Sequence, residues 1–153
     1  MTECLQDRYA PPNRCFGCGP ANSKGLRIKS RVEGEELVAE WTPEPHHQGF
    51  PGSLNGGIVG ALFDCHSNWA AAYHLMQKAG SNELPSTVTA DFAVKLLRPT
   101  PTDRPLHLRA RVVESSQRRA VVEASLRADG EVCATCRGTF VAVKPDHPAF
   151  GRW

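Results

Sequence analysis

Asp64 is the residue whose setting most suggests chemistry. It stands eight residues after Gly56 in a stretch that is otherwise almost wholly apolar. An isolated carboxylate there costs free energy unless it is paired, hydrogen-bonded or required for function. A raised pKa in such a setting would suit a general base or a nucleophile. Asn68 follows one helical turn later on the same face, where its amide could orient a water or a substrate carbonyl.

Two glycines, Gly56 and Gly57, precede Asp64 at the expected start of the same helix. Glycines at a helix start leave backbone N–H groups unshielded, so a carbonyl or phosphate oxygen can approach the positive end of the helix dipole. The pair therefore indicates either an oxyanion hole or a close contact between helix and sheet that needs no ligand.

Two histidines, His66 and His74, lie in the same stretch. At two and ten residues from Asp64 they fall on other sides of a helix, so they form neither a metal pair nor a charge relay with it. We expect both to be structural.

Six cysteines are present, and four of them form two CxxC pairs, Cys15/Cys18 and Cys133/Cys136. The spacing is that of zinc ligands, but such pairs normally lie in tight turns. Cys133 and Cys136 lie in a segment with the pattern of a strand, where residues three apart point to opposite faces. The sequence therefore favours ordinary thiols over zinc or disulfides, and it predicts no metal site.

The elements that must position these groups follow from the hydrophobic pattern. Residues 26–41 alternate around Gly34, which predicts a two-stranded hairpin, and residues 43–54 form a loop. Residues 56–76 are apolar nearly all round, which indicates a buried helix. Four segments rich in strand-forming residues follow, at 87–98, 106–115, 120–128 and 131–143. The order predicts an α+β protein in which one antiparallel sheet wraps a single helix.

Length and composition suit one domain. The chain has 153 residues and a net charge of +2, and its lysines and arginines are scattered, which gives little support to nucleic-acid binding. No stretch approaches the roughly 20 apolar residues that span a bilayer, and the N-terminus lacks an apolar leader. We expect a cytoplasmic protein with no membrane partner, built from an irregular arm (1–24), a domain (25–145) and a tail (146–153).

The loop that enters the helix resembles a known family. Residues 51–57 read PGSLNGG, and Asp64 stands nine positions after Asn55. This is similar to the PaaI-type acyl-CoA thioesterases of the hot-dog superfamily, which typically show P-G-x-x-H-G-G with an acidic residue nine positions after the His. The resemblance extends through CFGCG at 15–19, TADF at 89–92 and LRP at 97–99. It implies a single hot-dog fold, with a long central helix wrapped by a six-stranded antiparallel sheet.

The resemblance also implies a reaction, the hydrolysis of an acyl-CoA thioester to free acid and CoA, with no cofactor because coenzyme A belongs to the substrate. The Gly56 amide would polarise the carbonyl, Asp64 would attack it or activate a water, and Gln48 would help to place that water. The site would lie between the subunits of a homodimer, or of a dimer of dimers, with Thr89 or else Thr87 on the partner side. The remaining candidates for substrate binding are Gly57 and Phe63, and, for the CoA phosphates, Arg98, Arg118 and Arg119.

One departure from the family pattern bears on activity. Asn55 stands where the family usually has His, and an amide can donate a hydrogen bond but cannot titrate near neutral pH. If that His only contacts the thioester or holds the loop, Asn55 preserves the site. If it does more, the chain would be a non-hydrolytic module that binds acyl-CoA or an acyl carrier. A hydratase of the same superfamily is a weaker third reading, because such enzymes use an Asp and His pair that this opening lacks.

Overall fold

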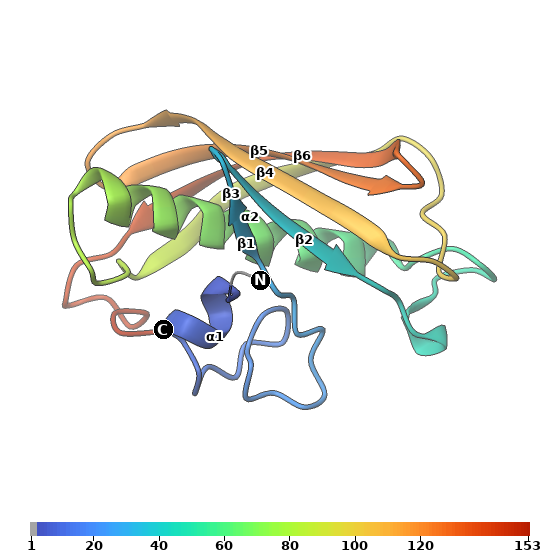
Figure 1. The fold of residues 1–153 in the computed structure, drawn as a ribbon, viewed down its shortest axis with the longest axis horizontal. Helices are drawn as coiled ribbons and strands as arrows, with labels where there is room; N and C mark the ends of the chain where they lie inside the picture. The colour runs from blue at the N-terminus through green and yellow to red at the C-terminus, as the bar shows by residue number, and fades with distance from the viewer. Residues whose placement is uncertain (1–2) are drawn as a thin grey trace.

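The computed structural model describes residues 3–153, which form one antiparallel sheet and one long helix (Figure 1). The elements in chain order are α1 (Leu5–Tyr9), β1 (Arg31–Glu33), β2 (Glu36–Trp41), the 3₁₀ helix η1 (Pro45–His47), α2 (Gly56–Lys78), β3 (Thr87–Leu96), β4 (Leu106–Ser115), β5 (Arg119–Ala128) and β6 (Glu131–Ala142). The six strands follow the order β1-β2-β4-β5-β6-β3, and every neighbouring pair is antiparallel. The predicted α+β layout, with one long helix and six strands, is confirmed.

The long helix α2 is buried along most of its length because it is covered on two sides. The sheet curls over one side, and the N-terminal arm lies across the other (Figure 1). Leu62, Phe63 and Trp69 are fully buried in the main core. A helix enclosed in this way has no polar face, which explains why its sequence is apolar nearly all round.

A buried chain of hydrogen bonds fastens the arm to the helix. The Gln6 amide donates to the Ser30 hydroxyl (2.9 Å), which is 2.8 Å from Nδ1 of His66, and Nε2 of His66 is 2.9 Å from the carbonyl oxygen of Leu37. Burial lowers the pKa of His66 to about 4, so the ring is neutral, and both of its nitrogens are engaged. His66 therefore has the structural role that we expected.

Two details of the arm and the hairpin differ from the sequence prediction. The arm is not wholly irregular, because Leu5–Tyr9 form a short helix. The first hairpin strand is only Arg31–Glu33, whereas the alternating pattern begins at Leu26. The backbone N–H groups of Leu26 and Ile28 donate instead to carbonyl oxygens of the arm, at 2.7 and 3.1 Å. Residues that alternate in polarity can therefore pack under an arm as well as pair in a sheet.

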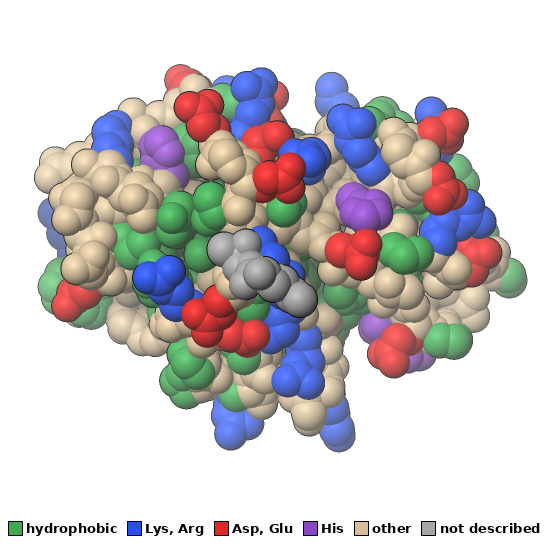
Figure 2. All heavy atoms as spheres, viewed as in Figure 1, with side chains coloured by type: hydrophobic (Ala, Val, Ile, Leu, Met, Phe, Trp, Pro, Cys, Tyr) green, Lys and Arg blue, Asp and Glu red, His purple; other side chains and the backbone are tan. Residues whose placement is uncertain are grey.

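Charges of both signs are interspersed over the face shown in Figure 2, so that face has no field of a single sign of the kind that attracts nucleic acid. Within residues 3–153, no helix combines the length and the apolar character needed to cross a membrane.

Candidate active site

Asp64 lies at the contact between α2 and β3. The hydroxyl of Thr89 donates to Oδ1 of Asp64 at 2.5 Å. Burial raises the pKa of Asp64 above its ordinary value, whereas the Thr89 hydrogen bond and the positive charge of Arg152 act in the opposite direction. A partly desolvated carboxylate held by one hydroxyl is suited to attack a carbonyl or to take a proton from a water.

An irregularity in β3 aims Thr89 at this carboxylate. Thr89 lies opposite Phe140 on β6, but Asp91 lies opposite Thr139, so the register shifts between them. Phe92 lies opposite Gly138 and Leu96 opposite Ala134. Strand residues alternate between faces, so in a regular strand Thr89 would point away from the face that carries residues 92 and 96. The bulge places all three on the helix-facing side.

The Thr89 contact is made within one chain. We expected Thr89 on the partner side of a site between subunits, and in this respect the prediction differs from the structure. The physical reason is that α2 crosses β3 of its own sheet, so the two side chains meet without a second copy.

The helix start is built around Asn55. Its side-chain oxygen accepts a hydrogen bond from the Ile58 backbone N–H at 3.2 Å, which makes it the N-cap of α2. A Cβ atom at position 57 would lie 2.9 Å from that oxygen, so the cap requires Gly57 to be a glycine. Asn55 therefore holds the helix opening, which is one of the two roles that we considered for the residue at this position.

The amide end of α2 opens onto a cavity of about 390 Å³. Gly56 is exposed and lines it, together with Phe50 and Leu54 of the preceding loop and Leu96 and Arg98 at the end of β3. The first N–H groups of a helix have no acceptor within the helix. A carbonyl oxygen entering this cavity would therefore meet free donors at the positive end of the helix dipole. Sequence reasoning missed Phe50 and Leu96, because nothing in a single sequence shows which loop and strand end close over Gly56.

Gly56 and Asp64 cannot serve the same carbonyl from one chain. Eight residues of α-helix span about 12 Å, and an attacking group and an oxyanion donor must both lie about 3 Å from the reacting atoms. If both groups act on one thioester, they must therefore come from two chains, and we call Gly56 the amide half and Asp64 the carboxylate half of the candidate site.

Asn68 has a different role from the one that we predicted. Its side-chain oxygen accepts from the Thr87 hydroxyl at 2.6 Å, and its amide nitrogen donates to the Thr87 carbonyl at 3.3 Å. Both residues are buried. The amide is thus used to join α2 to the start of β3, and it is not free to orient a substrate.

Replacing Asn68 by Ala should lower the free energy of unfolding by about 2–3 kcal/mol, because it leaves the buried Thr87 hydroxyl without its acceptor. Chemical denaturation monitored by circular dichroism measures this. Ser67→Ala is the matched control, since the buried Ser67 hydroxyl has no hydrogen-bond partner among residues 3–153, and this variant should be neutral or slightly more stable. A normal stability for Asn68→Ala together with a large loss of turnover would restore the catalytic reading.

Gln48 and Phe63, two other residues predicted for the site, do not join Asp64. Gln48 is exposed in the loop before α2, where its side-chain oxygen accepts from the Gly52 N–H at 3.4 Å. It therefore lies at the Gly56 end of the helix and not beside Asp64. Phe63 is fully buried in the core, so in the single chain it is not open to a substrate. Its side chain packs on a different face of α2 from the carboxylate that follows it.

The three arginines do not form one group within a chain. Arg98 lines the Gly56 cavity and forms an ion pair with Glu131 at 2.6 Å. Arg118 donates to the Ala142 carbonyl at 2.6 Å, and Arg119 opens β5 opposite Val141. Arg98 contacts β6 at Cys133, eight residues from Val141, and a strand of that length spans about 26 Å.

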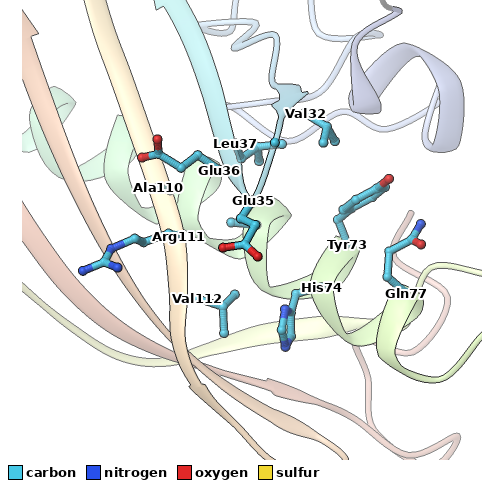
Figure 3. Close-up of a pocket in the computed structure, with 12 residues that line it drawn as sticks. Val32, Glu35, Glu36, Leu37, Tyr73, His74, Gln77, Ala110, Arg111 and Val112 are labelled. Atoms are coloured by element: carbon cyan, nitrogen blue, oxygen red, sulfur yellow. The ribbon is translucent and has the colours of Figure 1, made fainter.

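A second cavity, also of about 390 Å³, lies away from these residues (Figure 3). Tyr73, His74 and Gln77 of α2 line one side of it, and the β1–β2 hairpin and Val112 of β4 line the other. Tyr73 is seventeen residues along the helix from Gly56, which is about 26 Å. The residues that line this cavity include none of Gly56, Asp64 and Thr89, so it is separate from the candidate site.

Comparisons with known proteins bear on the family and the fold. Residues 42–141 match the family described as the acyl-CoA thioesterase N-terminal domain. A thioesterase superfamily protein from Shewanella loihica is 31% identical, with a TM-score of 0.65, over 82% of this chain and 98% of its own. A search of curated proteins gave no match.

More distant structures share the fold. A putative thioesterase from Ralstonia eutropha, described as related to phenylacetic acid degradation, is 22% identical with a TM-score of 0.67, over 82% of this chain and 92% of its own. The PaaI protein of E. coli is 17% identical with a TM-score of 0.64, over 78% and 81%. The hot-dog fold and the likeness to PaaI that we predicted are confirmed. The family match covers well over half of the chain and includes α2 and the last four strands, so this protein belongs to the acyl-CoA thioesterase family.

Proposed function

We propose that this protein hydrolyses acyl-CoA thioesters to the free acid and CoA. The Gly56 N–H stabilises the oxyanion that develops on the thioester carbonyl. The Asp64 carboxylate takes a proton from a water as that water attacks the carbonyl carbon, the C–S bond breaks, and the proton passes to the departing CoA thiolate. Direct attack by Asp64, followed by hydrolysis of the acyl-enzyme anhydride, uses the same two groups.

The observation that carries this proposal is the setting of Asp64. Its carboxylate is partly buried, is held by the Thr89 hydroxyl, and lies on the helix-facing side of an edge strand. A surface Asp with a purely structural role needs neither burial nor a bulge to reach a partner.

A homodimer would bring the two half-sites together. β3 is an edge strand and exposes apolar side chains, with Phe92 40% and Leu96 61% exposed. Edges of this kind pair with another strand. Within each chain Asp64 lies beside Thr89, and a Cβ atom at Gly56 would lie 3.6 Å from Leu96. Antiparallel pairing of two β3 strands would therefore set the Asp64 end of one chain against the Gly56 end of its partner.

Arg98 is the arginine whose position suits a CoA phosphate, because it lines the cavity into which the Gly56 amide opens. A phosphate there would compete with Glu131 for the guanidinium. Arg118 and Arg119 could take part only from the other subunit, since they lie at the far end of the sheet.

Steady-state hydrolysis of a panel of acyl-CoAs, with short, long and aromatic acyl groups and with released CoA measured by chromatography, tests the proposed function. We expect turnover of at least one thioester. Tight binding of the same compounds without any turnover would instead favour the non-hydrolytic module that Asn55 suggests, and it would overturn the proposal.

A further inference from the structure

Three cysteines distant in sequence meet beside the candidate site. The Sγ atoms of Cys15, Cys18 and Cys65 all lie within 4.8 Å of one another, and those of Cys15 and Cys65 are 3.7 Å apart. Cys65 directly follows Asp64 on α2, whereas the other two come from the N-terminal arm. All three are free thiols. In a tetrahedral site with Zn–S bonds of about 2.3 Å, neighbouring sulfur atoms are about 3.8 Å apart, so the separation of Cys15 and Cys65 already matches that geometry.

The arm is shaped to bring its pair of sulfurs onto the helix. Residues 15–19 read CFGCG, and the Gly19 N–H donates to the Cys15 carbonyl at 2.8 Å, which closes a tight turn. A Cβ atom at position 17 would lie 2.3 Å from the sulfur of Cys65. A glycine is therefore required where the turn presses against the third thiol. Tight CxxC turns of this kind are the usual way in which a chain offers two sulfurs to one metal.

A buried donor near the cluster lacks a partner. The Nε1–H of Trp69 is fully buried and makes no hydrogen bond within residues 3–153. Trp69 is near Cys18, because a hydrogen bond from its indole would favour the thiolate form of that residue and so lower its pKa. A buried N–H without an acceptor is costly, and a metal-bound thiolate is an acceptor that would satisfy it.

We propose that Cys15, Cys18 and Cys65 form a zinc site with three thiolate ligands. Within residues 3–153, no fourth Cys, His, Asp or Glu atom joins the group, so the fourth position is taken by water or another small ligand. This inference does not depend on thioester hydrolysis. It revises our expectation that the cysteines are ordinary thiols. The sequence concealed the site because the third ligand lies 47 residues beyond Cys18 and has no motif of its own.

Bound zinc would fasten the arm to α2 at the residue next to Asp64. A disulfide is the competing use of these thiols, but it joins only two sulfurs, whereas all three converge here. It would also need an oxidant such as a peroxide to accept the two electrons.

Titration of the reduced, full-length protein with Co²⁺ under anaerobic conditions tests the proposal. We expect one equivalent per chain to produce the intense visible and near-ultraviolet bands of tetrahedral cobalt thiolate, and Zn²⁺ to bleach them. Cys65→Ala should weaken metal binding by more than the roughly 100-fold that the loss of a partner outside the coordination sphere costs. Cys133→Ala is the matched control, because this buried cysteine belongs to the other CxxC pair, and it should leave binding unchanged.

A second measurement uses the wild-type chain alone, in case Cys65→Ala fails to fold. Zinc should protect Cys15, Cys18 and Cys65 from alkylation, as mapped by mass spectrometry, and a chelator should abolish that protection. Three outcomes would overturn the proposal. The first is the absence of cobalt thiolate bands at stoichiometric metal, and the second is bands that survive in Cys65→Ala. The third is a reduced protein that binds no metal but forms a disulfide among these cysteines when it is treated with peroxide.

Discussion

Asp64→Asn should lower kcat for acyl-CoA hydrolysis by about 10²- to 10⁴-fold, the range that a positioned general base contributes. The amide has the same shape as the carboxylate, and it can still accept the hydrogen bond from Thr89. The fold should therefore persist while the group that takes the proton, or attacks the carbonyl, is lost. KM should change little, because Asp64 acts on the reacting atoms and not on the CoA moiety. The measurement is steady-state release of CoA from the best substrate in the panel.

Asp91→Asn provides the matched control. Asp91 is also on β3, but it is exposed. It lies opposite Thr139, and its side chain is therefore on the other face of the strand from that of Thr89. The change in charge is identical, so a general electrostatic effect would slow both variants. Equal rates for Asp64→Asn and wild type would reject the role that we assign to Asp64.

Gly56→Pro should lower kcat by about 10²- to 10³-fold, the cost of removing one oxyanion donor. Proline has no N–H, yet it is well tolerated at the first position of a helix, where that group has no helical partner. The residue before a proline must be extended, and Asn55 already has φ −58° and ψ 133°. The substitution thus deletes the proposed donor and leaves the helix start intact, which circular dichroism would verify.

Gly56→Ala is the control for this change. It keeps the N–H and adds a Cβ atom 3.6 Å from Leu96, an ordinary contact distance. We expect it to retain most of the activity. If Gly56→Ala and Gly56→Pro lose activity equally, the space beside Leu96 matters and the amide does not.

The two inactive variants also test whether the half-sites come from different chains. If Asp64→Asn and Gly56→Pro chains are unfolded together and refolded, half of the dimers will be mixed, and each will carry one intact site of two. Activity should therefore return to about a quarter of the wild-type value. No recovery would mean that Gly56 and Asp64 do not act together across a subunit interface, and it would contradict the dimer that we propose.

The fold could be predicted from the sequence because its signals are local. Alternation, turn residues and one long apolar segment predicted the six strands and the helix, and the helix and the last four strands begin and end within two residues of the predicted positions. The first hairpin strand was overestimated because the arm satisfies the backbone of Leu26 and Ile28, and no local pattern records that partner.

The site was only partly predictable. The spacing of Gly56 and Asp64 is local, and both residues lie on one helix, as the apolar pattern predicted. The partners of Asp64 and Asn68 are not local. Thr89 reaches Asp64 only because β3 carries a bulge, and Asn68 meets Thr87 across nineteen residues. A single sequence shows neither the bulge nor the pairing.

The bulge in β3 makes the length of this strand matter more than the identity of most of its residues. A substitution within the strand alters one contact. The loss of the extra residue, Ala90, would restore the regular alternation of side chains between the two faces of the strand. Thr89 and Leu96 could then no longer both point at the helix. An exchange of one side chain leaves the register of the strand unchanged, whereas a gain or loss of one residue beside the bulge would separate the Thr89 hydroxyl from the Asp64 carboxylate.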